Sequence, residues 1–195
     1  IVKRIEDIVL AVVALVALSP IMFVTAAAIR LDSKGPIFFR QRRIGKSGRH
    51  FEMYKYRSMY EDAEKRRASL SDLNESGGPL FKIKEDPRVT FVGRLIRRMC
   101  IDELPQLLNV LKGEMSLVGP RPLPVMDIQM PSEWEQGRFS AVPGITGMWQ
   151  VNRLAHTPEE MLKWDLLYIE SWSLWLDFRI LLKTIGVVLS GRGSY

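Results

Sequence analysis

The sequence feature that most constrains the fold is a long apolar segment near the N-terminus. Ile8 to Ile29 contains no charged residue and is long enough to cross a bilayer, for which about 20 apolar residues suffice. Basic residues flank it on both sides, Lys3 and Arg4 before it and Arg30 and Lys34 after it. Because cytoplasmic flanks carry the excess of Lys and Arg, this pattern places both ends of the segment in the cytoplasm.

A proline interrupts the segment near its middle. Pro20 has no backbone N–H and its ring crowds the preceding turn, so a bend is expected there. The hydroxyl of Ser19 can bond to a backbone group that the bend frees. Two arrangements are compatible with these residues. One is a simple transmembrane span, and the other is a re-entrant helix that turns at Ser19 and Pro20 and leaves the membrane on the side from which it entered. A cleaved signal peptide is disfavoured, because the apolar run is long and residues 19–22 match a cleavage site poorly.

The basic residues are concentrated directly after this segment. The chain of 195 residues has a net charge of +6. Residues 30–57 hold nine Lys or Arg and two acids, for +7, so the remainder nets −1. A basic block beside an apolar anchor favours a membrane surface over nucleic acid as the partner. Cys100 is the single cysteine, which excludes a disulfide framework and favours a reducing compartment.

The rest of the chain is predicted to form one mixed α/β domain that is mostly helical. Two short strands are expected at Ile37–Gln41 and Phe51–Tyr56, with a turn at Gly45–Gly48 between them. Helices are expected at Phe91–Met99, at Asp102–Lys112 with Gly113 as its stop, and at Pro158–Glu170 with Thr157 as its N-cap.

A final helix is predicted from Leu174 to Leu189, where apolar residues recur at helical spacing. Trp172 and Trp175 lie near its start, and tryptophan favours the bilayer interface. The pattern fits two arrangements. The helix packs on the core of the protein itself, or it lies in the membrane interface beside the N-terminal helix.

Carboxylates are the candidate reactive groups. The sequence has neither a dinucleotide-binding nor a P-loop glycine motif, and no Cys/His cluster that could hold zinc. Asp102 and Glu103 follow a basic turn, and Pro105 marks the first turn of the next helix. An ionised carboxylate there can attack phosphorus or bind Mg²⁺. The alternative is that both acids only cap a helix and pair with Arg97 or Arg98.

Two further clusters supply cations. Pro120 and Pro122 lock the backbone around Arg121, which suits bidentate contact with a phosphate, although a rigid connector with a solvated arginine fits equally. Lys55 and Arg57 are two residues apart on a predicted strand and so share one face. That face either binds an anionic substrate or is simply solvated.

Taken together, these motifs resemble the monotopic polyprenyl-phosphate phosphoglycosyl transferases, the bacterial sugar transferase family. The resemblance runs along nearly the whole chain. It rests on residues 3–8 leading into Ser19 and Pro20, and on residues 41–45, 54–59, 86–90, 102–113, 115–122, 143–151 and 191–195.

The resemblance implies a role for each candidate residue. Asp102 matches the family's nucleophile, and Glu103 matches the second member of the acidic pair. Mg²⁺ at Asp102 would neutralise a diphosphate. Cations that match positions facing the substrate phosphates or nucleotide are Lys55, Arg97 and Arg121, with Arg57 beside them. Ser19 and Pro20 match the break in a re-entrant helix.

The implied reaction transfers a sugar 1-phosphate from a UDP-sugar to polyprenyl (undecaprenyl) phosphate through a phosphosugar–Asp102 intermediate. It would be the first membrane step of exopolysaccharide, capsule, O-antigen or glycoconjugate assembly. The closing segment is similar to larger members, which favours a hexose, glucose or galactose. We expect a membrane-inserted helix at residues 1–32 and a catalytic domain at residues 33–195, on the cytoplasmic face of the bacterial inner membrane. The expected partners are membrane lipid and a second copy in a homodimer. A non-catalytic membrane adaptor is the rival from another class.

Overall fold

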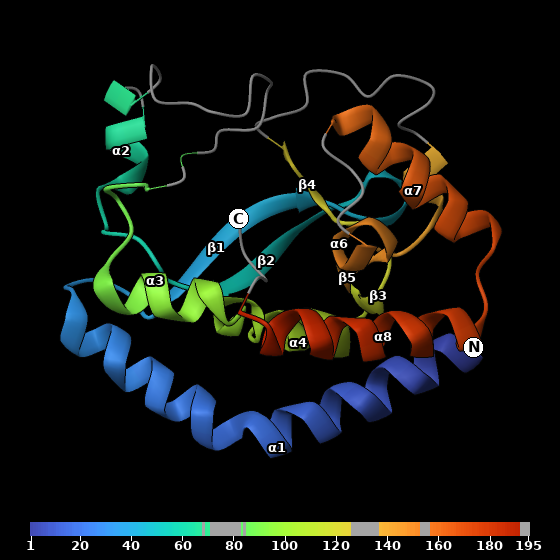
Figure 1. Cartoon of the computed structure of the whole chain (residues 1–195), viewed down its shortest axis with the longest axis horizontal. Helices are drawn as coiled ribbons and strands as arrows, with labels where there is room; N and C mark the ends of the chain where they lie inside the picture. Colours follow the sequence, from blue (N-terminus) through green and yellow to red (C-terminus); the bar gives the residue numbers. More distant parts are fainter. Residues whose placement is uncertain (68, 71–82, 84, 126–136, 153–156, 192–195) are drawn as a thin grey trace.

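The computed structural model describes residues 1–67, 69–70, 83, 85–125, 137–152 and 157–191. Residues 192–195, on which the hexose expectation partly rests, lie outside them. The described residues form a mostly helical α/β fold, as predicted (Figure 1). In chain order its elements are α1 (Val2–Asp32), β1 (Phe38–Ile44), η1 (Lys46–Gly48), β2 (His50–Tyr56), α2 (Ala63–Arg67), α3 (Phe91–Arg98), η3 (Ile101–Glu103), α4 (Gln106–Lys112), β3 (Ser116–Val118), β4 (Leu123–Pro124), η5 (Gly137–Ser140), β5 (Gly144–Thr146), α6 (Met148–Asn152), α7 (Pro158–Glu170) and α8 (Leu174–Leu189).

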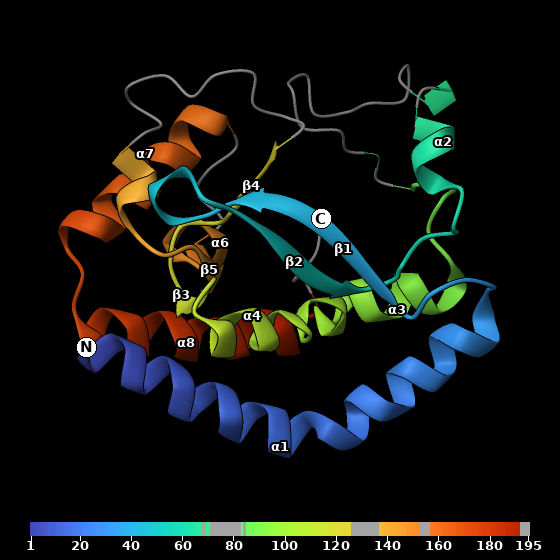
Figure 2. The same cartoon turned by 180° about the vertical axis from the view of Figure 1, so that it is seen from behind.

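The long N-terminal helix α1 is bent near its middle (Figures 1 and 2). Pro20 lies inside the helix, and its missing N–H leaves the carbonyl of Val16 without its usual helical donor. The Ser19 hydroxyl donates to that carbonyl at 2.8 Å. The predicted bend and the predicted use of the Ser19 hydroxyl are both confirmed.

Both ends of α1 are bonded to the same folded body. At the N-terminal end, Lys3 pairs with Asp177 of α8 at 2.5 Å, and Arg4 donates to the carbonyl of Leu111 at the end of α4. At the other end, the Asp32 carboxylate accepts from the backbone N–H of Val92 at 3.1 Å, and Ile29 is buried. The two ends of α1 therefore contact the folded body, and the bend between them lies away from it (Figure 1).

Most of α1 between these ends is exposed. Among the described residues, α1 is the one helix with the length and composition to cross a membrane, and 11% of its apolar window is buried. A core helix of a soluble domain would be mostly buried, so α1 is not one. Its large exposed side chains include Val9, Val13, Val16, Phe23 and Val24.

Strands β1, β2 and β4 form a three-stranded antiparallel sheet in the order β2-β1-β4. The β1–β2 hairpin is longer than predicted, because pairing continues from Phe38 opposite Tyr56 to Ile44 opposite His50. The side chain of Asn109, which is fully buried in α4, bonds to the outer side of β2. It accepts from the N–H of Tyr54 at 3.0 Å and donates to the carbonyl of Glu52 at 2.7 Å.

Helices α3, α4 and α8 form a row between α1 and the sheet (Figures 1 and 2). The predicted limits of α7 and α8 are confirmed. Thr157 caps α7 with a reciprocal bond to Glu160, and Ser173 caps α8. One side of α8 packs on Val118 and Tyr168 through Ile180. Its other side is apolar and exposed, with Trp175, Phe178, Leu182, Ile185 and Leu189.

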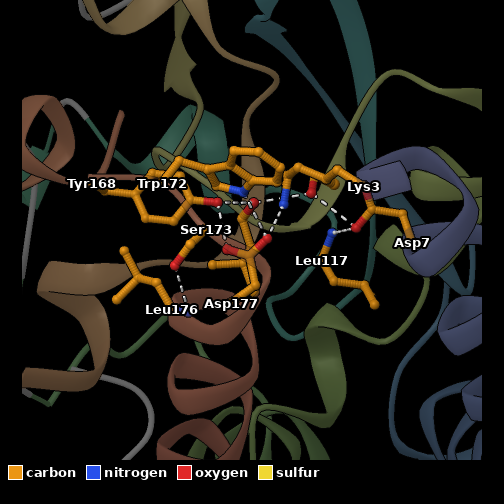
Figure 3. A network of polar contacts seen from close by, with 10 residues as sticks. Lys3, Asp7, Leu117, Tyr168, Trp172, Ser173, Leu176 and Asp177 are labelled. Carbon is orange, nitrogen blue, oxygen red and sulfur yellow. Dashed lines mark hydrogen bonds and ion pairs between the residues drawn. The ribbon is translucent and has the colours of Figure 1, made fainter. Parts of the chain in front are cut away.

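A buried polar network fixes the N-terminal end of α1 to α8, α7 and β3 (Figure 3). The Asp177 carboxylate accepts from Lys3, from Trp172 Nε1 at 3.0 Å and from the Tyr168 hydroxyl at 2.7 Å. The Asp7 carboxylate accepts from the Ser116 hydroxyl and from the Leu117 N–H, both at 2.9 Å. Asp177 is 1% exposed, and each of its two oxygens has a donor.

Candidate active site

Asp102 and Glu103 lie in a short 3₁₀ turn, η3, between α3 and α4. The expected continuous helix from Asp102 to Lys112 is therefore wrong. Pro105 has no N–H to offer the Ile101 carbonyl, which accepts instead from Leu104 at 3.1 Å. The α-helix begins only at Gln106, and it ends at a left-handed Gly113, as predicted.

Cys100 sets the direction of this turn. Its backbone is left-handed, with φ of 53°, which is uncommon for a residue other than glycine, asparagine or aspartate. Burial, with Glu103 and Asp102 adding to it, raises the pKa of the Cys100 thiol to about 11. The thiol therefore stays protonated and unreactive at neutral pH. Sequence reasoning missed this role, because cysteine is not a residue that signals a left-handed turn.

Glu103 joins two cations that are far from it in the sequence. Its Oε1 atom accepts from Lys55 Nζ at 2.7 Å and from Arg121 Nη2 at 3.1 Å. Lys55 comes from β2 and Arg121 from the loop between β3 and β4. The side chains of Lys55 and Glu103 are 17% and 18% exposed, and that of Arg121 is 35% exposed. The structure thus brings three predicted site residues together.

The two adjacent carboxylates have opposite surroundings. Asp102 is 7% exposed, and its buried Oδ1 atom has no hydrogen-bond donor among the residues that the structure describes. Burial raises the pKa of Asp102 to about 6, although Lys55 acts against the rise. Burial also favours a higher pKa for Glu103, but Lys55 and Arg121 outweigh it and lower that pKa to about 2. Both groups are ionised at neutral pH, and only Glu103 holds the cations directly.

The two other predicted cations lie in different places. Arg97, in α3, is one of the cations that oppose the burial-driven rise in the pKa of Asp102, so its charge reaches the site. Arg57 follows the end of β2 and is 6% exposed. Its guanidinium donates to the carbonyls of Ser33 and Lys34, which connect α1 to β1. The structure does not bring Arg57 to the Glu103 cluster, and its role in binding substrate stays a prediction.

Close backbone packing holds the loop that presents Arg121. The N–H of Gly119 donates to the Thr146 carbonyl and the N–H of Gly144 to the Pro120 carbonyl, both at 2.9 Å. A Cβ atom on Gly144 would lie 2.1 Å from the Gly119 nitrogen, and one on Gly119 would lie 2.5 Å from the Val142 carbonyl oxygen. Only glycine allows this approach. The motifs at residues 117–122 and 143–147 therefore pack directly against each other through their backbones.

Sequence reasoning also missed Arg138 and Asp165. They form a buried ion pair, 7% and 1% exposed, between η5 and α7. The Arg138 guanidinium also donates to the Arg121 carbonyl at 3.1 Å. The residues are 27 positions apart, and in the sequence each is an ordinary charge on a helical segment.

The residues at Asp102 fit a magnesium ion that arrives with its substrate. Among the described residues, no group of three or more His, Cys, Asp or Glu side chains could hold a metal by itself. Mg²⁺ is commonly bound by one or two carboxylates together with substrate phosphates. The Asp102 carboxylate can supply such a ligand, since its Oδ1 atom has no hydrogen-bond partner among the described residues and its two oxygens are not both needed for one bond.

Comparisons with known proteins place the chain in a family. The family model described as bacterial sugar transferase matches residues 1–191. The chain is 43% identical to the galactosyl transferase CpsE of Streptococcus agalactiae, over 98% of the chain and 43% of that protein. It is 37% identical to the exopolysaccharide production protein ExoY of Sinorhizobium fredii, over 99% of the chain and 88% of that protein.

A third relative carries both a donor and an acceptor in its name. It is the UDP-N-acetylgalactosamine-undecaprenyl-phosphate N-acetylgalactosaminephosphotransferase of Aeromonas hydrophila, 42% identical over 99% of the chain and 45% of that protein. The chain thus spans less than half the length of the Streptococcus and Aeromonas relatives and most of the length of ExoY. The matched region contains Asp102, Glu103, Lys55 and Arg121. The chain belongs to the bacterial sugar transferase family.

Proposed function

We propose that the chain is the catalytic part of a phosphoglycosyl transferase, which moves a sugar 1-phosphate from a UDP-sugar to polyprenyl phosphate. The products are UMP and a polyprenyl-diphosphate-sugar. The observation that carries the proposal is the contrast within the acidic pair. Asp102 presents a buried oxygen to which no described residue donates a hydrogen bond, while cations that suit a diphosphate are held beside it by Glu103. The relatives' names supply the donor and acceptor classes.

In the first half-reaction an oxygen of Asp102 attacks the β-phosphorus of the UDP-sugar. A bond forms between that oxygen and phosphorus, and the bond from the β-phosphorus to the bridging oxygen breaks. UMP leaves with the bridging oxygen, and the sugar phosphate stays on Asp102 as an acyl phosphate. An oxygen that accepts no hydrogen bond keeps its electron pairs available for this attack. Burial that raises the pKa of Asp102 also makes the carboxylate more basic.

In the second half-reaction an oxygen of polyprenyl phosphate attacks the same phosphorus. The acyl phosphate bond breaks, Asp102 returns as a carboxylate, and the polyprenyl-diphosphate-sugar is released. The acceptor phosphate is already an anion, so no proton has to be removed before it attacks.

Glu103 acts as the holder of the cations. The pKa of Glu103 lies far below neutrality, because Lys55 and Arg121 outweigh the effect of burial, which makes Glu103 a poor proton acceptor. Its Oε1 atom instead holds Lys55 Nζ at 2.7 Å and Arg121 Nη2 at 3.1 Å. Arg121 and Lys55 stabilise the negative charge of the diphosphate, with Arg97 adding its charge from α3.

The proposed cofactor is Mg²⁺, held by Asp102 and the substrate diphosphate. When bound, it neutralises charge on the diphosphate and assists the departure of UMP. Lys55, Arg97 and Arg121 surround Asp102 with positive charge, which disfavours binding of the metal before the diphosphate arrives.

The proposed sugar is a hexose, glucose or galactose. The galactosyl relative supports this choice, and the N-acetylgalactosamine relative, at nearly the same identity, names the alternative. The exopolysaccharide relative supports a place at the first membrane step of polysaccharide assembly.

The proposed location is the cytoplasmic face of the bacterial inner membrane, with α1 re-entrant. Both ends of α1 are bonded to one body, which a simple span would prevent. To test this, cysteine is placed at Val2 or Ser33 and cells are treated with a thiol reagent that cannot cross the membrane. Both cysteines should stay unlabelled. Labelling of the first with protection of the second would show a span.

The reaction itself is tested without the acceptor. Purified protein is incubated with Mg²⁺ and UDP-glucose, UDP-galactose or UDP-N-acetylgalactosamine in separate reactions. We expect about one UMP per protein and a mass increase equal to one sugar phosphate, with ping-pong kinetics once acceptor is added. Asp102→Asn should remove both signals. An adduct on Glu103 would mean that Glu103 is the nucleophile and Asp102 is not. Sequential kinetics without any adduct would refute the covalent step.

A further inference from the structure

Arg121 must keep a fixed position, because it lies between Glu103 and the expected substrate phosphates. Its side chain is long and is 35% exposed, so Glu103 alone restrains only its tip. Precise placement of the guanidinium therefore depends on the backbone that carries it. A displacement of about 1 Å at such a group can cost about a hundredfold in rate.

Three successive carbonyls of this loop each accept a hydrogen bond from a different segment. The Pro120 carbonyl accepts from the N–H of Gly144 at 2.9 Å. The Arg121 carbonyl accepts from Arg138 at 3.1 Å, and the Pro122 carbonyl accepts from Arg43 at 2.8 Å. Two of the three donors are guanidinium groups that come from outside the two glycine motifs.

Arg138 is itself held from the far side. Its Nη2 atom pairs with the Asp165 carboxylate of α7, and both side chains are almost fully buried. Burial of a charged pair is costly unless its geometry is good and its remaining donors are satisfied. Here the same nitrogen also donates a hydrogen bond to the Arg121 carbonyl. The buried ion pair is therefore bonded directly to the backbone of a site residue.

We propose that Arg138, fixed by Asp165, is a positioning residue that holds the Arg121 backbone so that its guanidinium faces Glu103 and the substrate diphosphate. Arg138 acts through Arg121 and does not contact the reacting atoms. The proposal deepens the proposed function and rests on it for its kinetic test.

The test is a double-mutant cycle measured as kcat/KM for UMP release. Arg138→Ala should lower kcat/KM by about 10- to 100-fold when Arg121 is present. In an Arg121→Ala background the same change should cost less than about twofold, because residues that act through one another are not additive. Equal losses in both backgrounds would overturn the proposal.

Arg88 provides the matched control. It is also a buried arginine, 5% exposed, that pairs with an aspartate, Asp86, and donates to a backbone carbonyl, that of Ala63. Any effect of Arg88→Ala on kcat/KM should be the same with and without Arg121. If Arg138→Ala does not fold, Arg138→Lys enters the same cycle, since the lysine chain is one bond too short to place its nitrogen where Arg138 Nη2 bonds to both Asp165 and the carbonyl.

A second measurement is independent of the reaction. Hydrogen exchange of the amides of Gly119 and Gly144, whose N–H groups bond across this loop, should accelerate at least tenfold in Arg138→Ala, and not in Arg88→Ala. Unchanged exchange in Arg138→Ala would refute the positioning role even if the reaction is as proposed. The wild-type protein could fail to release UMP while hydrogen exchange is still accelerated in Arg138→Ala. That result would refute the proposed function but would still support the contact between Arg138 and the loop.

Discussion

Asp102 and Asp177 are both buried aspartates beside basic side chains, yet their surroundings differ in kind. Asp177 is 1% exposed and receives donors on both oxygens, from Lys3, Trp172 and Tyr168 (Figure 3). Asp102 is 7% exposed, and in the described part of the chain its Oδ1 atom receives no donor. Lys55 and Arg121 bond instead to its neighbour Glu103.

In the proposed mechanism, this difference separates a structural carboxylate, Asp177, from a reactive one, Asp102. A buried carboxylate with all its donors stabilises the fold, and its removal leaves buried donors unpaired. A buried carboxylate without donors is unfavourable in the folded state, and such local cost concentrates where chemistry takes place. The two aspartates should therefore respond to the same substitution in opposite ways.

The largest expected effect is on turnover in Asp102→Asn. The rate of sugar-phosphate transfer should fall by about 10⁴-fold or more, as when a covalent nucleophile is removed. The free energy of unfolding should stay the same or rise by about 1 kcal/mol, because the amide removes a buried charge. Rate assays and urea unfolding measure the two quantities. A large loss of stability would mean that Asp102 is structural.

A smaller loss of rate is expected for Arg121→Lys. A lysine keeps the charge but not the fork that can bond to Glu103 and a phosphate together. Turnover should fall by about 100-fold, which is comparable to a 1 Å misplacement, with the melting temperature nearly unchanged. Turnover close to that of the wild type would reduce Arg121 to part of a rigid connector.

Asp177→Asn should show the reverse of the pattern at Asp102. Lys3 is 25% exposed and can be solvated, so the loss should be about 2 kcal/mol rather than the larger values of fully buried pairs. UMP release per folded protein should stay within about twofold of the wild type, since the network is separate from Glu103. A rate loss like that of Asp102→Asn would break the comparison.

Tyr168→Phe has the smallest expected effect, and it tests whether the donors of Asp177 stabilise the fold. It removes one hydroxyl, which donates to Asp177 at 2.7 Å and lies 3.1 Å from the Val118 carbonyl. The expected loss of stability is about 1 kcal/mol. Denaturant unfolding of Tyr168→Phe, Asp177→Asn and the double variant should show less than additive losses. Additive losses would mean that the hydroxyl does not act through Asp177.

Local signals predicted most of the helices. The Thr157 cap followed by Pro158 fixed the start of α7, and helical periodicity gave α8 its limits. The hairpin of β1 and β2 was predicted because a turn joins neighbouring strands. The helix at Asp102 was wrong at its start, because the effect of Pro105 on the first turn outweighed the apolar pattern that continues through Leu104.

Contacts between distant segments could not be read from single motifs. Asp102, Glu103, Lys55 and Arg121 were named from the sequence, but nothing in it showed that Lys55 and Arg121 meet at one oxygen of Glu103. Lys55 and Arg57 were expected to share a face, yet the strand ends at Tyr56 and Arg57 turns to the Ser33 and Lys34 carbonyls. Arg138 and Asp165 become visible only when η5 and α7 pack together.

The amide side chain of Asn109 has a consequence for assembly. A free sheet edge offers unpaired N–H and C=O groups to a strand of another molecule. At the outer edge of β2, Asn109 already occupies the N–H of Tyr54 and the carbonyl of Glu52. A second copy cannot add a strand there without displacing a fully buried residue. A homodimer of this chain would therefore have to form through a different surface, and this part of the sheet edge is protected from strand-by-strand aggregation.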